Sequence, residues 1–539
     1  MGKRKAFLLL IIILFIGGFF RFYKITEIPP GLYPDEAMNG NNALEALATK
    51  DFKIFYPENN GREGLFINLQ VASLKIFGNN PWALRGVSAA FGTLTILGIY
   101  LLASEFFVSR TIAVLSSFLL ATGFWHLNFS RIGFRAIMVP FFASFGMYFL
   151  LKGLRRGKKL DLALAGIFIG LGFHTYIAFR FMPFVLAVPI LWYLWQWRKL
   201  SAPNIVSPVK QCIPCGILLF LFVTFIAALP VGFYFLQHPQ DFLGRSGQVS
   251  IFSSISPIAE FAKSNILTLG MFFARGDCNW RHNFACLPEL NPLVALFFLI
   301  GIIASIRALF KKGGPRLPYY IVFAWFIFMT LPATLTAEGL PHALRSIGMI
   351  IPSMIFAGLG AKQIGEFALN WFENQKTKWP EYLRQIERIK RELVLLFILT
   401  LLIIPIATYR NYFIRWANNP NTYFSFATDT FHLSQFLNDL PADAKKYVIV
   451  NLPGTEVRGI PMSAQTVMFV TDTFREEKRV MKNIQYILPA NLDKITIAPD
   501  QKTIIAPLNG ADKQLISALK NKFPGLKTKV PGDFVILQN

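Results

Sequence analysis

Charged side chains are scarce in this chain of 539 residues: they make up 16% of it, whereas hydrophobic residues make up 54%. Soluble globular proteins carry roughly 25% charged residues. The shortage excludes a soluble globular protein, and the 55 phenylalanines strengthen that exclusion. A membrane protein is the class that remains.

Long polar stretches are also missing from much of residues 1–410, where apolar runs of roughly 17–25 residues recur. Runs of this length cross the hydrocarbon core of a bilayer as helices, and we expect about eleven of them. No small-residue cleavage site follows the first run, so it is expected to be a retained anchor and not a signal peptide. The runs lie near 6–23, 82–105, 111–128, 138–152, 161–179, 182–197, 212–236, 293–310, 318–336, 347–364 and 393–409.

Acidic residues are fewer than basic ones, 30 against 54, which gives a net charge of +24. Such a charge is found in nucleic-acid-binding proteins, but the basic residues here fall in alternate loops between the apolar runs. This is the pattern of the positive-inside rule, with the N-terminus in the cytoplasm and the opposite loops outside. It supports the membrane orientation and argues against nucleic acid as a partner. The basic groups are Arg110, 152–159, 198–210, 307–316 and 376–391.

Residues 411–539 lack long apolar runs and are expected to form an exoplasmic soluble α/β domain after a transmembrane domain over 1–410. Short β-rich runs alternate there with helical patterns, but no glycine loop that could cradle a phosphate is present. A structural or acceptor-docking role is therefore favoured over direct chemistry. The expected strands are 446–450, 483–488, 503–508 and 534–537, and the expected helices are 432–440 and 511–522.

Three further segments lie between the apolar runs. Two long loops, about 24–81 and 237–292, are expected on the exoplasmic side. The amphipathic and basic stretch 379–392 is expected to lie along the inner leaflet as an interfacial helix.

No Asp-x-Asp pair occurs in the chain, which argues against a site for a nucleotide sugar and its metal. An acidic pair, Asp35–Glu36, instead lies in the first outer loop, shortly after the first apolar run. A carboxylate can accept the proton of a hydroxyl group as a new bond forms. A helix N-cap is the structural alternative for Asp35, since residues 36–47 have a helical pattern.

Arginines recur in short polar groups at the predicted outer ends of the apolar runs. Each taken alone can be explained by snorkelling toward lipid headgroups. Several on the same side as an acidic pair point to a bound lipid phosphate, because guanidinium groups bind phosphate through forked, charge-assisted hydrogen bonds. The candidates for this phosphate are Arg62, Arg131 and Arg345, followed by Arg135, Arg180 and His342.

None of the six histidines is expected in the cytoplasm. Histidine tolerates interfaces, which explains this distribution without a site; a shared exoplasmic site that holds a divalent metal is the alternative. No two histidines have helical i, i+4 spacing, so the need for a metal stays open. The outer-loop residues that could contact an acceptor are Glu63, His174, Tyr176, Trp280, Arg281 and His282.

The four cysteines fall into two pairs. Cys278 and Cys286 share an outer loop, where an oxidising compartment favours a disulfide. Cys212 and Cys215 lie at the inner end of an apolar run without further cysteine or histidine partners, so they are expected to be reduced and packed.

Seven short motifs stand at the predicted outer ends of the apolar runs and in the outer loops: PDEA at 34–37, GREGLFINLQ at 61–70, WALR at 82–85, SRIGFR at 130–135, HTYIAFR at 174–180, GDCNWRHN at 276–283 and PHALRSIG at 341–348. Together they resemble those of a known superfamily, that of the dolichyl-phosphate-mannose protein mannosyltransferases, and of its prokaryotic members in particular, which implies an integral protein of a prokaryotic inner membrane. The similarity covers about residues 1–410 and is most specific over 30–105. Lipid A aminoarabinose transferases belong to the same group, the C-type integral-membrane glycosyltransferases.

The resemblance implies a C-type glycosyltransferase fold and an inverting transfer of sugar from a polyprenyl-phosphate carrier on the exoplasmic membrane face. The acceptor would be a hydroxyl group of a lipid, a glycan or a protein. Asp35 matches the family's essential first-loop aspartate, which would act as general base, and Glu36 matches its acidic neighbour. Arg62 keeps a cation where aminoarabinose transferases tend to have a lysine, but Glu63 and Gly64 stand in place of prolines and depart from the pattern.

Two other classes of membrane protein fit parts of the sequence. A transporter needs ionisable groups near the bilayer midplane, and the predicted apolar cores hold almost none. A non-enzymatic protein that binds a lipid or a polysaccharide would explain the outer loops, but it has no need of an acidic pair beside cations. A glycosyltransferase is the function that the sequence favours.

Overall fold

The computed structural model describes residues 1–200, 212–248, 250–498 and 500–539, and the chain divides into two compact units. The helical unit comprises Met1–Tyr23, Ser88–Arg131 and Arg135–Arg415. The mixed unit comprises Lys24–Val87, Ile132–Phe134 and Trp416–Asn539.

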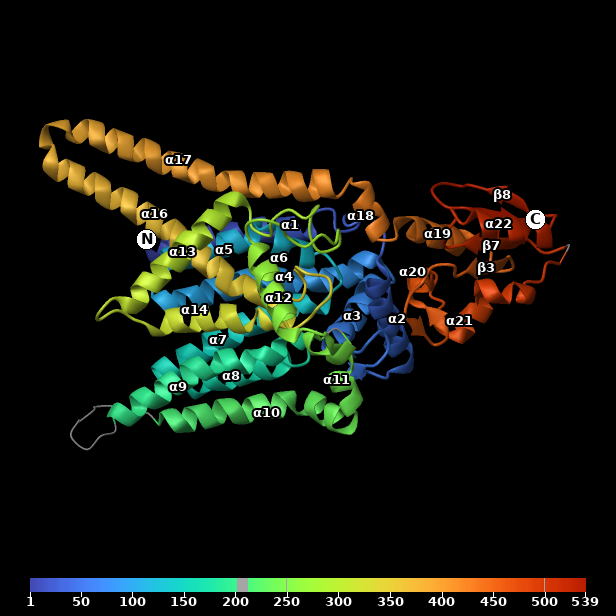
Figure 1. Cartoon of the computed structure of the whole chain (residues 1–539), viewed down its shortest axis with the longest axis horizontal. Helices are drawn as coiled ribbons and strands as arrows, with labels where there is room; N and C mark the ends of the chain where they lie inside the picture. The colour runs from blue at the N-terminus through green and yellow to red at the C-terminus, as the bar shows by residue number, and fades with distance from the viewer. Residues whose placement is uncertain (201–211, 249, 499) are drawn as a thin grey trace. The chain divides into compact units, whose positions relative to one another are not determined.

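Nine helical segments within the described residues are long and apolar enough to cross a membrane, and the chain is an integral membrane protein. They match nine of the predicted runs (Figure 1). Their helices are α1 (Lys3–Phe22), α4 (Pro81–Phe107), α7 (Met138–Arg156), α9 (Met182–Leu200), α10 (Ile213–Gln237), α13 (Pro292–Phe310), α14 (Leu317–Phe328), α16 (Ile350–Lys378) and α17 (Leu383–Tyr409).

The other two predicted runs are broken into shorter pieces. The first becomes α5 (Arg110–Thr122) and α6 (Phe124–Phe129), which are separated by the extended Gly123. The second becomes α8 (Lys159–Gly172) and the 3₁₀ turn η2 (Ile177–Phe181). A 14-residue helix such as α8 is about 21 Å long, which is short of the ~30 Å hydrocarbon core.

Small residues allow the helices to approach one another closely. Gly301 on α13 and Gly360 on α16 face each other: a Cβ at Gly301 would lie 1.7 Å from the Phe356 carbonyl oxygen, and one at Gly360 would lie 1.9 Å from that of Phe297. Backbone approach through glycine is how helices gain packing contacts in a bilayer, where lipid is as apolar as the side chains. Any larger residue at these two positions would push α13 and α16 apart.

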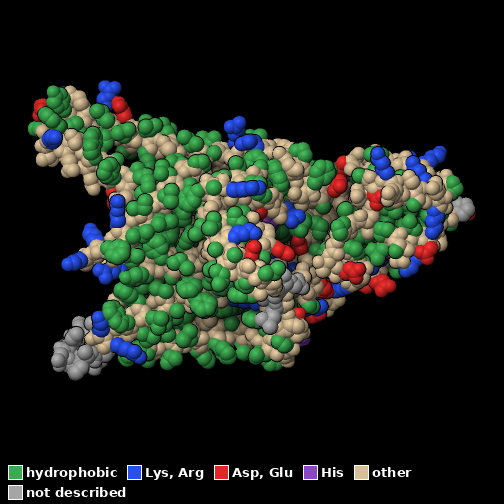
Figure 2. Space-filling view, in the orientation of Figure 1, with side chains coloured by type: hydrophobic (Ala, Val, Ile, Leu, Met, Phe, Trp, Pro, Cys, Tyr) green, Lys and Arg blue, Asp and Glu red, His purple; other side chains and the backbone are tan. Residues whose placement is uncertain are grey.

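Hydrophobic side chains cover the flank of the helical unit that faces the viewer in Figure 2. Lys and Arg gather on that view at the end of the bundle where α13 turns into α14 and where α16 meets α17. This segregation agrees with the alternation of basic loops in the sequence.

The stretch 379–392 does not form the separate interfacial helix that the sequence predicts. It holds a short 3₁₀ turn (Pro380–Tyr382) and the start of α17, so that α16 and α17 form a helical hairpin (Figure 1). Lys390 on α17 donates to Glu373 on α16 at 2.7 Å, and Lys376 pairs with Glu387. These ion pairs across the hairpin place the basic stretch on helices that continue the spans.

Both cysteine pairs form disulfides. The prediction that Cys212 and Cys215 are reduced is therefore wrong: they occupy the N-cap and the first turn of α10, which brings their Cα atoms to 5.3 Å. That separation is within the usual range for a disulfide. The structure also pairs Cys278 with Cys286.

In the mixed unit, the C-terminal residues form an α/β fold around a five-stranded sheet of order β6-β3-β7-β9-β8. Strands β6, β3 and β7 are parallel, whereas β9 runs antiparallel to both β7 and β8. Leu433 of α19 packs on one face and Leu519 of α22 on the other, so the predicted α/β class is confirmed. The strands are β3 (Lys445–Ile449), β6 (Ile484–Ile487), β7 (Thr503–Pro507), β8 (Lys527–Lys529) and β9 (Ile536–Gln538), and the helices are α19 (Thr428–Asp439) and α22 (Lys513–Lys522).

The first loop folds together with this C-terminal stretch. It contains α2 (Pro34–Thr49), α3 (Gly64–Phe77) and the short strands β1 (Phe55–Tyr56) and β2 (Arg62–Glu63). The helix α20 (Gln465–Val470) inserts Phe469 into the same apolar core as α2 and α3. A Cβ at Gly40 would lie 2.4 Å from the Phe469 ring, so glycine is what allows α20 to lie against α2.

Candidate functional site

The acidic pair lies in the first turn of α2. Tyr33 is the N-cap residue of this helix and Pro34 its first residue, so Asp35 is not the cap that was the structural alternative. Carboxylates in a first turn interact favourably with the positive end of the helix dipole. Both carboxylates therefore lie at the N-terminal end of α2, within the mixed unit.

The surroundings of the two acids differ. Glu36 is fully buried, and its carboxylate pairs with the buried Arg85: Nε–Oε1 is 3.0 Å and the second nitrogen lies 3.2 Å from Oε2. The Gly133 N–H also donates to Oε1 at 2.7 Å. Asp35 is half-buried and accepts a hydrogen bond from the Asn59 amide. Glu36 is thus fixed from several sides, whereas Asp35 is partly exposed and has one hydrogen-bond donor, Asn59, assigned to it.

Arg62 lies against the same helix as the acids. Its guanidinium donates to Asn39 at 2.8 Å and to Asn42 at 2.5 Å, and only 2% of the residue is exposed. Asn39 in turn donates to the Gly133 carbonyl at 3.0 Å. Arg62 therefore joins β2 to α2, and its neighbour Glu63 is buried beside it.

Arg131 lies in the helical unit and is fully buried. It donates to the carbonyl oxygens of Phe20 at 2.8 Å and Arg21 at 3.0 Å, which belong to the last turn of α1. A cation at a helix C-terminus stabilises the negative end of the dipole. The structure thus places this predicted phosphate ligand where it closes the end of the first span.

A second polar group forms in the helical unit around Asp277. His282 Nδ1 lies 2.8 Å and His342 Nδ1 lies 3.9 Å from the same carboxylate oxygen, Oδ2. One ligand atom from each of the three side chains can be chosen so that all lie within 4.8 Å of one another. Two imidazoles and a carboxylate are a donor set that zinc and related divalent ions use. Among the described residues, this is the group of three that could hold a metal.

Buried groups on three sides support this cluster. The Ala343 N–H donates to Asp277 Oδ2 at 2.9 Å. Glu289 accepts from the Asp277 N–H at 3.0 Å, and burial raises the pKa of Glu289 well above its ordinary value. The Trp125 indole of α6 donates to the Ala343 carbonyl at 3.1 Å. The loop before α13 and the segment around Ala343 are thereby fixed to each other.

The remaining predicted cations of the helical unit are half-buried. Arg345 donates to the Thr336 hydroxyl at 2.8 Å and to the Glu338 carbonyl at 2.9 Å. Arg135 lies over the Tyr176 ring, with its central carbon 5.3 Å from the ring centroid.

Other predicted residues of this unit bond to nearby backbone. Arg180 donates to the Phe242 carbonyl at 2.9 Å, and His174 Nε2 lies 2.9 Å from the Ala227 carbonyl. These two contacts link neighbouring segments of the helical unit, and neither involves a residue of the Asp277 cluster.

Two predicted acceptor residues lie in the same loop as Asp277. Trp280 packs edge-on against Phe284, with ring centroids 5.6 Å apart. The Arg281 carbonyl accepts from the Asn128 amide of α6 at 2.7 Å. The Trp280 ring is thus held by packing, and the loop backbone is held at Arg281 by a hydrogen bond from α6.

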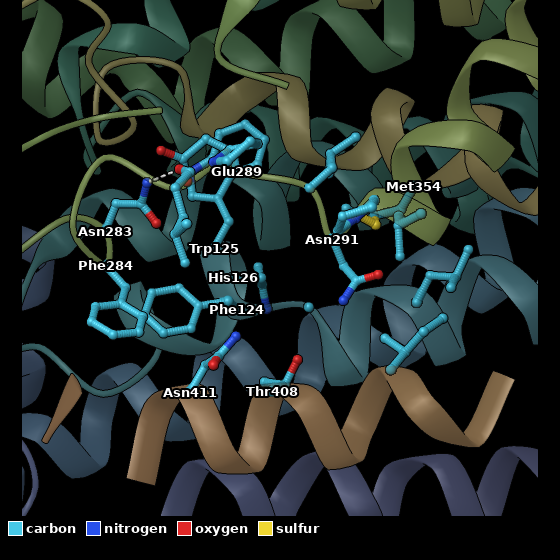
Figure 3. A pocket seen from close by; sticks show the side chains of 18 of the residues that line it. Phe124, Trp125, His126, Asn283, Phe284, Glu289, Asn291, Met354, Thr408 and Asn411 are labelled. Carbon is cyan, nitrogen blue, oxygen red and sulfur yellow. Dashed lines mark hydrogen bonds between the residues drawn. The ribbon is translucent and has the colours of Figure 1, made fainter. Parts of the chain in front are cut away.

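A cavity in the helical unit contains none of the predicted site residues. Figure 3 shows His126 of α6, Thr408 of α17 and Asn411 of the π-helical turn after α17 (Arg410–Trp416) among the side chains around it. Arg21 must donate to His126 Nδ1, 2.7 Å away, so Nε2 of that ring carries the proton. The lining is mostly apolar, and of its polar side chains Asn283 belongs to the quoted motif at 276–283.

Three residues of these groups were missed by the sequence reasoning. Arg85 belongs to the quoted WALR motif, and its place soon after the acidic pair was a usable signal. Asp277 stands directly before Cys278 in GDCNWRHN, where a disulfide fixes the loop beside a histidine. Asn59 carries no local signal, since only the folded loop brings it to Asp35.

Comparison with known proteins gives a match to the family model described as dolichyl-phosphate-mannose-protein mannosyltransferase over residues 65–227. YkcB of Bacillus subtilis (strain 168), which is named as a mannosyltransferase, is 25% identical over 217 residues, or 39% of this chain. The match covers 29% of that relative, so the chain accounts for less than a third of its length.

Two solved structures share the fold. ArnT from Cupriavidus metallidurans, solved with bound undecaprenyl phosphate, has a TM-score of 0.54 at 12% identity, covering 100% of this chain and 98% of that one. The Archaeoglobus fulgidus oligosaccharyltransferase has a TM-score of 0.51 at 15% identity, covering 87% of this chain and 64% of that one. At such identities, the likeness concerns the fold alone.

Proposed function

We propose that the chain is a C-type integral-membrane glycosyltransferase that transfers a sugar from a polyprenyl-phosphate carrier to an acceptor hydroxyl group. The solved relative with bound undecaprenyl phosphate supports this donor class. The absence of an Asp-x-Asp pair supports a lipid-linked donor over a nucleotide sugar. We place the reaction on the exoplasmic face, with a lipid, a glycan or a protein as acceptor.

Asp35 is the general base in this proposal. The acceptor oxygen attacks the anomeric carbon as the bond from that carbon to the phosphate oxygen breaks, and Asp35 accepts the hydroxyl proton. A single displacement of this kind inverts the anomeric centre and releases the polyprenyl phosphate. The observation that carries the assignment is the difference within the pair: Glu36 is enclosed by Arg85 and Gly133, whereas Asp35 is partly exposed.

Cations must stabilise the charge that develops on the departing phosphate, and preorganised charges are often the largest catalytic contribution. We assign this role to the half-buried Arg135, Arg180 and Arg345, and leave His342 to the Asp277 cluster. Arg62 and Arg131 are first choices from the sequence together with Arg345, but both are buried as well as bonded to protein acceptors, which favours a scaffolding role for these two.

Purified protein in vesicles tests the donor class. Transfer of labelled sugar from a polyprenyl monophosphate sugar, and no transfer from a nucleotide sugar in vesicles without carrier, is the expected result. Activity with nucleotide sugar alone would contradict the proposal. Partition of the label among lipid, glycan and protein fractions then identifies the acceptor class.

A further inference from the structure

A hairpin of the C-terminal stretch has an unusual residue at its tip. Strands β4 (Glu456–Val457) and β5 (Ile460–Pro461) are joined by Arg458 and Gly459, whose φ angles are 51° and 76°. Two-residue turns with both φ angles positive favour asparagine and glycine, because other side chains are strained there. An arginine in the first position points to a requirement for its side chain.

The Arg458 side chain links two carboxylates of the first loop. It binds Glu45 with both nitrogens at 2.8 Å and Glu58 Oε1 at 3.0 Å. These acids, Glu45 foremost, raise the pKa of Arg458 above its ordinary value. A forked guanidinium holds such a pair at fixed geometry and cancels the repulsion between the two acids.

Each of these carboxylates belongs to a segment that positions Asp35. Glu45 lies on α2, the helix whose first turn carries Asp35. Glu58 directly precedes Asn59, whose amide donates to Asp35. Arg458 therefore binds both the helix that carries the proposed base and the turn that supplies the hydrogen-bond donor of that base.

The turn itself needs such support. Asn59, Asn60 and Gly61 have φ angles of 53°, 60° and 80°, a run of three left-handed residues. A Cβ at Gly61 would lie 2.5 Å from the Phe55 ring. Left-handed conformations of non-glycine residues cost free energy and persist where surrounding contacts hold them.

We propose that Arg458 is a positioning residue for Asp35: by holding Glu45 and Glu58, it keeps the 57–61 turn where Asn59 can donate to the base. The inference rests on the proposed function and assigns the C-terminal domain a part in turnover. It acts through Asn59 and needs no contact between Arg458 and a substrate.

Exposure separates this role from a purely structural one. The Arg458 side chain is 40% exposed, and exposed ion pairs contribute little to stability. The apolar stem of a methionine can keep the packing of Arg458 on Phe474, which lies 4.5 Å away. Arg458→Met should therefore fold normally while it releases the turn.

The test compares Arg458→Met, Arg458→Lys and the control Arg475→Met in the full-length protein. Arg475 is a matched cation of the same domain that pairs with Glu477, two residues away. Loss of positioning should lower kcat about 10- to 100-fold in Arg458→Met with little change in KM for the donor. Arg458→Lys should recover part of that loss, and Arg475→Met should equal the wild type. Unchanged kcat in Arg458→Met, or a loss confined to KM, would overturn the inference.

Two further measurements complete the test. In an Asn59→Ala background, Arg458→Met should lower kcat by little more, because the contact it supports is already gone. Hydrogen exchange of peptides over 57–61 should rise in Arg458→Met and stay unchanged in Arg475→Met, whether or not transfer is detected. Unaltered exchange over 57–61 in Arg458→Met overturns the positioning inference. If exchange rises in that variant while the wild type shows no transfer activity, only the proposed function is rejected.

Discussion

The Arg85 guanidinium lies against the Glu36 carboxylate, with 3.0 Å between Nε and Oε1, and their side chains are only 1% and 0% exposed. Arg85 also donates to the carbonyls of Pro29 at 2.7 Å and Gly31 at 2.8 Å, just before α2. Arg85, near the start of α4, is thus bonded both to the first turn of α2 and to the residues that precede this helix. The pair explains why two adjacent acids can differ in role.

Glu36→Gln should destabilise the mixed unit. It leaves the Arg85 charge buried without its counter-charge, which costs about 3–5 kcal/mol when one partner of a buried pair is removed. Thermal unfolding in detergent measures this cost. Glu27→Gln is the control, because Glu27 pairs with Lys24 at the surface, where 61% of its side chain is exposed. Equal unfolding midpoints for the two variants would contradict the structural role of Glu36.

Asp35→Asn should leave expression, folding and donor binding nearly unchanged and lower turnover about 10²–10⁴-fold. The asparagine keeps the shape of the side chain but cannot accept the acceptor's proton. Steady-state kinetics with a polyprenyl-phosphate sugar measure the change. Near-normal turnover in Asp35→Asn together with a dead but folded Glu36→Gln would reverse the assignment of the base.

The sequence predicted well those features that depend on local composition. Nine helical spans and the α/β class of the C-terminal residues followed from apolar runs and short β-rich segments. Two predicted runs are divided in the structure, because apolar residues resume after Gly123 and after residues 173–176, where the helices α5 and α8 have ended. Apolar composition predicts which segments can lie in lipid, but it does not predict the residue at which a helix ends.

Contacts between distant segments could not be predicted from one sequence. Arg62 and Arg131 have the residue type of a phosphate ligand, yet their partners, Asn42 and the Phe20 carbonyl, come from elsewhere in the chain. The same holds for the union of the first loop with α20 through Phe469, across nearly 400 positions of sequence. Spacing identifies candidates, and only tertiary structure tells which of them are already engaged.

Arg131→Ala should act mainly on stability. It removes two charge-assisted hydrogen bonds to the last turn of α1 and the packing of the guanidinium on Phe413, which lies 5.0 Å from it. A loss on the order of 3 kcal/mol is expected, since each such bond contributes about 1.5–3 kcal/mol. Arg345→Ala is the comparison: it should unfold like the wild type and lose donor use. A folded Arg131→Ala protein that fails only in donor binding would restore Arg131 as a phosphate ligand.

The Asp277 cluster should bind one zinc ion per chain. Its two imidazoles and one carboxylate offer three protein ligands, the number found in sites that keep an open position. Metal analysis after dialysis against zinc, with and without a chelator, measures the stoichiometry. His282→Ala should lower zinc content strongly, whereas His432→Ala, on the C-terminal domain, should not. Equal zinc content in the two variants would assign the cluster to hydrogen bonding alone.

Cysteine alkylation should find no reactive thiol in denatured, unreduced protein and four after reduction, because both pairs are disulfide-bonded. Cys278→Ser should expose one thiol, that of Cys286, and loosen the loop that carries Asp277 and His282. The result also bears on topology, since disulfides persist in oxidising compartments and are rare in the cytosol. If two thiols react before reduction and map to Cys212 and Cys215, that pair is reduced, as expected for the cytoplasmic side. Four reactive thiols before reduction would contradict both pairings.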